Sequence, residues 1–156
     1  MKITIVAIGK KHDSRLVEAI ENYSARLTHY VKLEWKPLEA KITPTMSKEH
    51  IKNIESEVLL LQTSAEDTVI ILDENGTSLS SPALARKLQH YMNQSIKNLV
   101  IIIGGAYGVS DALLKRADFI WSISPLVFPH QLVRLILAEQ LYRAHSIIAG
   151  EKYHHI

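Results

Sequence analysis

Five short apolar runs, each followed by a segment with helical periodicity, limit what this chain can fold into. The runs are Ile3–Ile8, Val31–Trp35, Thr68–Leu72, Leu99–Ile103 and Phe119–Ile123. Most are apolar almost throughout, as strands buried on both faces are, whereas Val31–Trp35 alternates apolar and polar residues. The pattern predicts an α/β fold with a mostly parallel sheet of five to six strands and helices on both faces.

The segments between these runs have the spacing and the capping residues of helices. Apolar residues lie on one stripe in each of the first two segments, Leu16–Ile20–Tyr23–Leu27 and Ile51–Ile54–Val58–Leu61. Ser47 and Ser81 are the predicted N-caps of the second and third helices, and Pro82 follows Ser81 at the first helical position. A short helix is expected from Ser110, and the longest helix is expected to run from about His130 to Ala149.

The length and composition of the chain indicate one globular domain. The 156 residues contain no internal repeat and no linker, so we expect a single domain over residues 1–156. The absence of cysteine excludes disulfides, cysteine-ligated zinc and thiol catalysis. No stretch has the length of a transmembrane helix or the features of a signal peptide, so we expect a cytoplasmic protein without a membrane partner.

The ends of the predicted strands are the places to look for a ligand, because parallel sheets bind ligands beyond their carboxyl ends. The run "LVIIIGGAYGVS" stops on Gly104 and Gly105, and the turn "DENG" at residues 73–76 follows the third strand. The glycine segment matches neither a P-loop nor a dinucleotide-binding fingerprint. Its glycines either bring the backbone close to a flat ligand or form a tight turn, and the spacing leaves both open.

The last predicted helix is apolar around most of its circumference, although a helix that covers a sheet needs only one apolar stripe. Burial on two sides explains this surface, and in so small a domain the second side indicates a homodimer. Four charged or titratable residues lie within the helix: His130, Arg134, Glu139 and Arg143. Glu139 and Arg143 have the i, i+4 spacing of an ion pair.

Three further features have simple structural explanations. The tail "EKYHHI" carries two histidines without an HExxH motif or a carboxylate cluster, so we expect no metal site. Lys10 and Lys11 are equally consistent with a solvated loop and with an RNA contact. Trp35 and Trp121 are expected to be packing residues.

Three segments resemble the bacterial RlmH family. They are "MKITIVAIGK" at residues 1–10, "IIIGGAYG" at residues 101–108 and "FPHQLVRLILAEQLYRAHSIIAGEKYHH" at residues 128–155. The resemblance covers essentially the full length and implies a SPOUT methyltransferase, a homodimeric α/β-knot enzyme with a deep C-terminal trefoil knot. It implies that the chain uses S-adenosyl-L-methionine to methylate N3 of a pseudouridine in 23S rRNA on the assembled ribosome.

The resemblance also implies roles for individual residues. The cofactor site would be built from Leu72, Gly104, Ile123, Ser124, Pro125, Leu126, Val127 and Phe128. The catalytic, substrate-binding end would be built from Arg143, Tyr153 and His154. The chain departs from the family at Val127, commonly Thr, at Thr77, where the family tends to have Lys, and at His155, where it tends to have Arg or Lys.

Two other functions stay open at this point. One is a methyltransferase of the same fold that acts on tRNA, and the other is a non-catalytic nucleotide-binding module of the flavodoxin-like type. The modest net charge of +2 favours the ribosome over free RNA, because a ribosomal site can be recognised partly by shape. A response regulator is disfavoured, because the first strand ends in "AIGKK" without an acidic pair.

Overall fold

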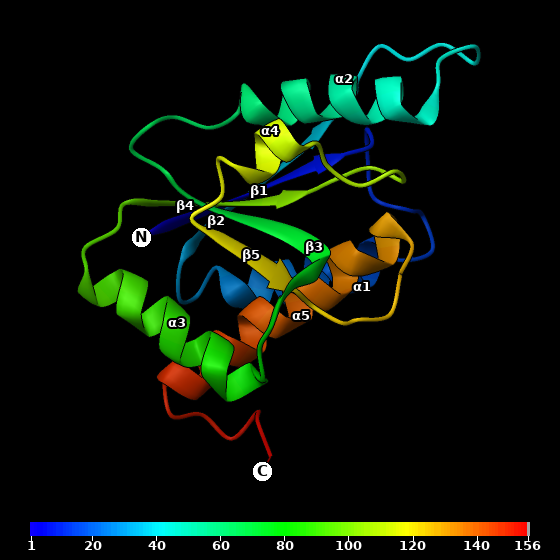
Figure 1. Ribbon diagram of the computed structural model, residues 1–156. Helices are drawn as coiled ribbons and strands as arrows, with labels where there is room; N and C mark the ends of the chain where they lie inside the picture. Colours follow the sequence, from blue (N-terminus) through cyan, green and yellow to red (C-terminus); the bar gives the residue numbers. More distant parts are fainter. Residues whose placement is uncertain (156) are drawn as a thin grey trace.

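The computed structural model describes residues 1–155, so Ile156, the last residue of the predicted domain, lies outside the described part. Across residues 1–155 all strands are parallel and form one sheet in the order β2-β1-β4-β3-β5 (Figure 1). The strands are β1 (Lys2–Ile8), β2 (Lys32–Leu38), β3 (Thr68–Ser78), β4 (Asn98–Ile103) and β5 (Phe119–Ser122). The predicted parallel α/β fold is therefore confirmed, with five strands in the described residues.

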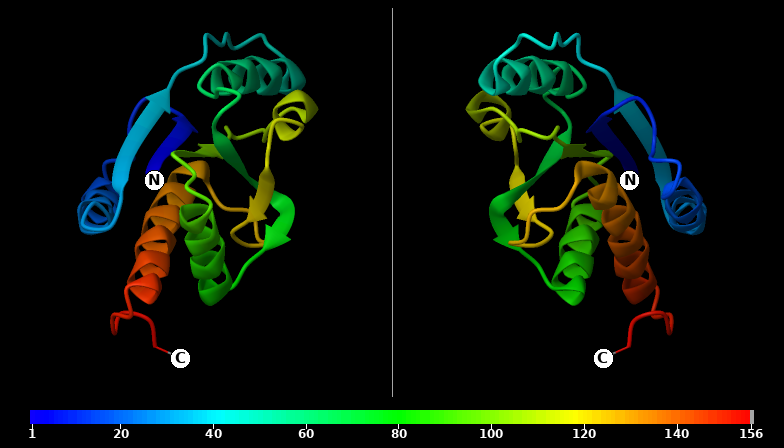
Figure 2. Two further views of the ribbon diagram at one scale, coloured as in Figure 1. Left: turned by 90° about the vertical axis from the view of Figure 1, so that its left-hand side faces the viewer. Right: turned by 90° about the vertical axis from the view of Figure 1, so that its right-hand side faces the viewer.

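Helices cover both faces of the sheet (Figures 1 and 2). One face carries α1 (Val17–Leu27), α3 (Ser81–Asn93) and α5 (His130–Ile148), and the other carries α2 (Lys48–Leu60) and α4 (Asp111–Leu114). Alternate strand residues point to opposite faces, so Ile5 packs on the first side and Val6 on the second. Burial on both sides is the reason why the strand sequences are apolar without alternation.

The wide apolar surface of α5 is largely buried within one chain. The helix contacts both α1 and α3, and Leu137, Leu141 and Ala144 have no exposed surface. Packing inside the chain thus accounts for much of the surface that indicates a homodimer from sequence. The homodimer stays a prediction, as does the trefoil knot.

The expected turn at residues 73–76 is wrong, because β3 continues to Ser78. The pairing of β3 with β5 shifts between Leu72 and Thr77, which both face Trp121. A bulge of this kind bends the strand without ending it. Gly76 lies in the bulge, where a Cβ atom would be only 2.7 Å from the carbonyl oxygen of Ile120.

Three smaller predictions are also corrected. Pro37, which lies beyond the predicted strand Val31–Trp35, belongs to β2, an edge strand in which a missing N–H group is tolerated. Leu61 is 82% exposed, because α2 ends at Leu60 and faces the protein with Glu55, Ser56 and Leu59. The N-cap of α3 is Ser80, whose Oγ accepts from the N–H of Ala83 at 3.3 Å.

His145 makes the stability of the fold depend on pH. It is buried in α5, its Nδ1 donates to the carbonyl of Leu141 at 2.8 Å, and burial lowers its pKa. As the pH falls below about 6.5, His145 binds a proton in the unfolded chain but stays neutral in the folded chain. The free energy of unfolding therefore decreases.

We expect His145→Phe to flatten this acid-side loss, by at most about 1.4 kcal/mol per pH unit for one histidine. Urea unfolding between pH 5 and 8 measures the slope. His29→Gln, at an exposed position, is the control. Equal slopes in wild type and His145→Phe would contradict the assignment. His12 and His130, whose pKa values burial also lowers, contribute to the slope that remains, and Glu55, whose pKa burial raises, contributes with the opposite sign.

Candidate functional site

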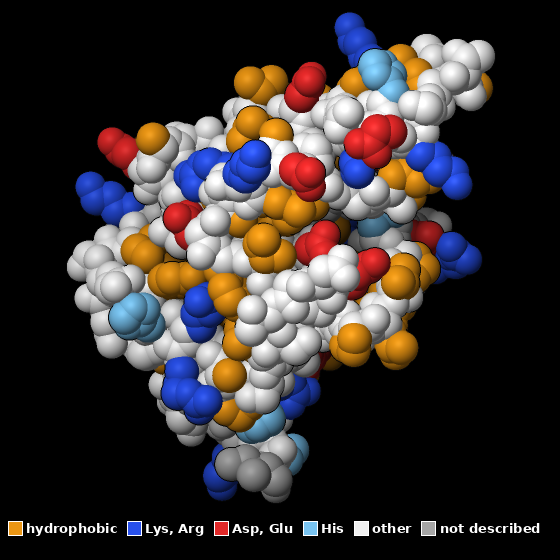
Figure 3. All heavy atoms as spheres, in the orientation of Figure 1, with side chains coloured by type: hydrophobic (Ala, Val, Ile, Leu, Met, Phe, Trp, Pro, Cys, Tyr) orange, Lys and Arg blue, Asp and Glu red, His pale blue; other side chains and the backbone are white. Residues whose placement is uncertain are grey.

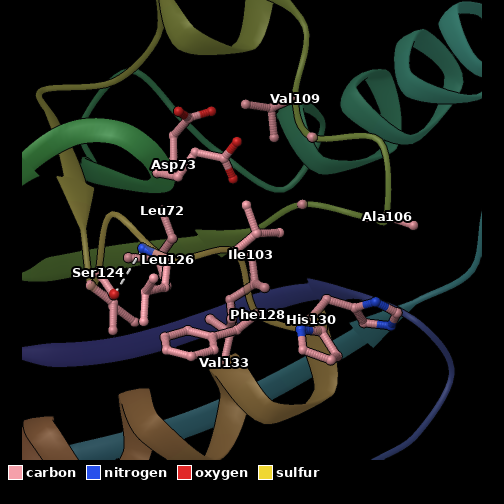
Figure 4. Close-up of a pocket in the computed structure, with 17 residues that line it drawn as sticks. Leu72, Asp73, Ile103, Ala106, Val109, Ser124, Leu126, Phe128, His130 and Val133 are labelled. Atoms are coloured by element: carbon pink, nitrogen blue, oxygen red, sulfur yellow. Dashed lines mark hydrogen bonds between the residues drawn. The ribbon is translucent and has the colours of Figure 1, made fainter.

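A cavity of about 550 Å³ lies at the carboxyl ends of β4 and β5, beside the bulged part of β3 (Figure 4). Its walls come from residues 72–74 of β3, from the glycine loop at residues 103–109 and from residues 123–133, which lead from β5 into α5. Leu72, Ile103, Phe128 and Val133 make much of the lining apolar. Ligand pockets in proteins commonly have this volume and character.

The cavity brings together most of the residues expected around the cofactor. Seven of the eight line it: Leu72, Gly104, Ile123, Ser124, Leu126, Val127 and Phe128. Pro125 is exposed and does not line the cavity. Ser124 shapes the loop, because its Oγ accepts from the N–H of Leu126 at 3.0 Å (Figure 4). Leu126 and Val127 are 68% and 75% exposed, so the mouth of the cavity presents apolar side chains to the outside.

The structure gives the double glycine a role that neither sequence-based alternative describes, close packing inside the protein. A Cβ on Gly104 would lie 2.7 Å from Cγ1 of Val109, and a Cβ on Gly105 would lie 2.7 Å from Cδ of Glu55. Packing inside the protein therefore demands glycine at both positions. The same two residues line the cavity, so their backbone is available to a ligand.

The α2 helix supports this loop from the side away from the cavity. Glu55 is buried against Gly105, its Oε2 has no hydrogen-bond partner, and burial raises the pKa of its carboxyl group. Ser56 accepts a hydrogen bond from the backbone N–H of Ser110 at 2.8 Å. These two polar contacts could not be predicted from the apolar stripe of α2, because Glu55 and Ser56 do not belong to it.

Three polar residues to which the sequence assigned no individual role also line the cavity. Asp73 and Glu74 line it on one side and His130 on another. Asp73 is held in place, because its Oδ1 accepts from the backbone N–H of Asn75 at 2.8 Å. Burial, together with the nearby charge of Arg134, lowers the pKa of His130, so this ring is neutral at pH 7.

Arg143, Tyr153 and His154 lie together at the far end of α5. Arg143 donates to Oε1 of Glu139 from Nε at 2.9 Å and from Nη2 at 2.6 Å, which confirms the predicted ion pair. The hydroxyl of Tyr153 also donates to this oxygen, at 3.1 Å. Nη1 of Arg143 is 3.4 Å from Nδ1 of His154, and its guanidinium lies 4.7 Å from the ring centre of Tyr153. We call these four residues the tail cluster.

The electrostatics of the tail cluster keep two of its groups in fixed protonation states. Burial, the hydrogen bond to Tyr23 and the charge of Glu139 raise the pKa of Tyr153. The hydrogen bond to Glu139 raises the pKa of Arg143. Tyr153 therefore stays neutral and Arg143 stays charged throughout the physiological range.

The cavity is lined by the first turn of α5, at His130 and Val133, whereas the tail cluster lies towards the other end of the helix, at Arg143 and beyond. The rise of an α-helix puts Arg143 roughly 20 Å along the axis from His130, which lines the cavity. One chain alone therefore does not bring the two groups of predicted residues together.

Metal-binding and membrane-spanning features are both missing from the described part of the chain. Within residues 1–155, no group of three His, Asp or Glu side chains is arranged to hold a metal ion. No helix in this same range is both long and apolar enough to cross a membrane. The expectation that the protein needs no metal stays a prediction.

Comparison with known proteins identifies the family. A family model described as "Predicted SPOUT methyltransferase" matches residues 1–154. Proteins named ribosomal RNA large subunit methyltransferase H from Christiangramia forsetii and Desulfotalea psychrophila are each 42% identical to this chain over 156 residues, covering 99% of both chains. The solved structure of a "probable methylase family protein" from Haemophilus influenzae matches this chain with a TM-score of 0.58 at 13% sequence identity. The match covers 99% of this chain and 70% of the Haemophilus influenzae chain, and it shows the fold alone. The chain thus belongs to the SPOUT methyltransferases, in the family of the ribosomal RNA large subunit methyltransferase H proteins.

Proposed function

We propose that this protein uses S-adenosyl-L-methionine to methylate N3 of a pseudouridine in the 23S rRNA of the assembled ribosome. The observation that carries the proposal is the apolar cavity at the strand ends, lined by seven of the eight residues that the family resemblance implies. Family membership supplies the type of reaction, and the name of the relatives supplies the large-subunit rRNA. A ribosomal substrate would place the protein in the cytoplasm.

The cavity suits the adenosine part of this cofactor. Leu72 and Phe128 offer apolar surfaces for a flat ring, and the backbone of Gly104 offers polar groups with no side chain in the way. When bound, S-adenosyl-L-methionine supplies a methyl group on a cationic sulfur to an attacking nitrogen.

The tail cluster suits the chemistry of the base. Methylation requires the proton on N3 to leave, and negative charge then spreads over the two flanking carbonyl oxygens. In this proposal the guanidinium of Arg143 stabilises that charge, and the imidazole of His154 accepts the proton. Tyr153, which stays protonated, orients Arg143 by packing against it and by sharing Glu139.

A homodimer follows from the length of α5. If the cavity and the tail cluster serve one substrate, the roughly 20 Å between them must be bridged by a second copy. We propose that the tail of one subunit approaches the cavity of its partner. The exposed apolar side chains of Leu126 and Val127 at the mouth of the cavity support this arrangement. The trefoil knot implied by the resemblance is part of the same proposal.

The direct test uses ribosomes that lack the modification and S-adenosyl-L-methionine with a labelled methyl group. We expect label at one position of 23S rRNA. No label, with an active reference enzyme in parallel, would contradict the proposal. Label in tRNA alone would favour the tRNA enzyme, and nucleotide binding without any transfer would favour the non-catalytic module.

The roles of the tail cluster lead to a second expectation. Arg143→Ala and His154→Ala should each lower turnover by about a hundredfold, because the first removes the group that stabilises developing charge and the second removes the group that accepts the proton. Cofactor affinity, measured by calorimetry, should stay within about twofold, as for loss of a group that acts only in the transition state. His155→Ala, at the exposed neighbouring position, is the matched control. Loss of cofactor binding in both variants would contradict the proposal that the cavity binds the cofactor and the tail cluster acts on the base.

A further inference from the structure

The loop between β1 and α1, residues 9–15, is fastened to the start of α5. Arg134 has no exposed surface, and its Nη2 donates to the carbonyls of Ile8 at 2.7 Å and Gly9 at 3.1 Å. These bonds hold the chain where it leaves β1. Within residues 1–155 no carboxylate pairs with this buried guanidinium, so its hydrogen bonds to the two backbone carbonyls are contacts that offset the cost of burying it.

Gln131, one turn earlier, holds the next part of the loop. Its Oε1 accepts from the backbone N–H of Asp13 at 3.0 Å, and its Nε2 donates to the carbonyl of Lys11 at 3.1 Å. The amide of one side chain thus bridges two points of the loop. Together with Arg134, it fixes the backbone and leaves the side chains of Lys10 and Lys11 pointing out into solvent.

The loop concentrates positive charge in a chain that carries little of it. Its seven residues include three basic side chains and one acidic side chain, whereas the whole chain has a formal net charge of +2. Asp13 pairs with Arg15 at 2.8 Å, which leaves the two lysines. Lys10 is 3.7 Å from Glu39 in an exposed pair that contributes little. On the face shown in Figure 3, Lys and Arg side chains lie among acidic and apolar side chains.

The loop borders the cavity on the side opposite its acidic residues. A Cβ on Gly9 would lie 3.7 Å from Nε2 of His130, which lines the cavity. Asp73 and His130 lie on opposite sides of the cavity in Figure 4. The opening therefore has a basic flank at Lys10 and Lys11 and an acidic flank at Asp73.

We propose that Lys10 and Lys11 bind the phosphate backbone of the substrate RNA beside the base that is methylated. This inference rests on the proposed function. An RNA strand that approaches from the lysine side gains attraction, and one that approaches past Asp73 is repelled. Because the loop is already fixed, little backbone freedom is lost when the phosphates bind.

The test compares wild type with the double variant Lys10→Gln, Lys11→Gln. Sedimentation with unmodified ribosomes, at constant Mg²⁺ and increasing KCl, gives Kd as a function of salt. We expect weaker binding by the variant, and a slope of log Kd against log salt that is smaller by roughly 1.4, or about 0.7 for each phosphate that is no longer neutralised. The affinity for S-adenosyl-L-methionine, measured by calorimetry without ribosomes, should be unchanged.

The control double variant, Lys32→Gln with Lys97→Gln, removes the same charge from the opposite, amino-terminal edge of the sheet. It should leave the slope as in wild type. Three results would overturn the inference. They are an equal decrease of the salt slope in both double variants, an unchanged slope in the Lys10→Gln, Lys11→Gln variant, and a loss of cofactor affinity in that variant. Sedimentation does not depend on catalysis, so a wild type that binds but transfers no methyl group contradicts only the proposed function.

Discussion

Replacing Arg134 with Ala is expected to lower the free energy of unfolding by about 3 kcal/mol. The substitution leaves the carbonyls of Ile8 and Gly9 without their donor and opens a cavity where the side chain has no exposed surface. Release of the buried guanidinium, whose pKa burial lowers, offsets part of this loss. Urea unfolding followed by circular dichroism measures the difference.

A second measurement separates this explanation from a general loss of packing. The charge of Arg134 contributes to the lowered pKa values of His12 and His130, so both pKa values should rise in the folded variant. Nuclear magnetic resonance titration of the two rings reads this directly. Arg86→Ala, at an exposed position on α3, should change stability by less than about 0.5 kcal/mol. A loss below about 1 kcal/mol for Arg134→Ala would contradict the assigned role.

Replacing Gly76 with Ala is expected to cost about 2 to 3 kcal/mol and to weaken cofactor binding about tenfold. The new Cβ would lie 2.7 Å from the carbonyl oxygen and 2.8 Å from the carbonyl carbon of Ile120. Backbone atoms cannot rotate away as a side chain can, so β3 and β5 must separate. Asp73 lies three residues before Gly76, and Ile123 lies three residues after Ile120. Both line the cavity, so we expect the separation of the strands to displace them.

Two variants test the cause of this effect. Gly150→Ala also places Ala at a glycine, but there the cost is the positive φ of 73°, and no atom of residues 1–155 lies within 4 Å of the new Cβ. We therefore expect a loss of about 1 kcal/mol and an unchanged cofactor affinity. Adding Ile120→Ala to Gly76→Ala should not restore stability, because the collision is with the backbone. Full restoration would instead assign the collision to Cγ2 of Ile120, which would lie 2.9 Å from the new Cβ.

The strands could be predicted from the sequence because burial on both faces leaves an unbroken apolar run. Ile3–Ile8 and Leu99–Ile103 fall almost completely within β1 and β4. The predictions failed where a neighbour, and not local composition, decides the conformation. Residues 73–76 have the composition of a turn, yet Thr77 and Ser78 pair with β5 and the strand continues past the bulge. Leu61 is apolar and lies on the predicted stripe of α2, yet the helix ends at Leu60 and the side chain of Leu61 is exposed.

The same distinction applies to the candidate site. Strand ends and family resemblance together indicate the cavity, and the resemblance alone indicates the tail cluster. The burial of Arg134 could not be inferred, because its acceptors belong to a loop more than 120 residues earlier in the chain. Glu55 is a similar case, since its burial depends on how closely the backbone of Gly105 approaches it.

The uninterrupted α5 helix has a consequence for how the chain can vary in length. No glycine or proline occurs between His130 and Ile148. The helix therefore fixes both the distance and the relative orientation of the cavity and the tail cluster. One residue inserted between His130 and Arg143 would turn the tail by about 100° and shift it by about 1.5 Å. Length changes in related chains are therefore expected in the exposed loop at residues 41–47, and within α5 only when they come in whole turns.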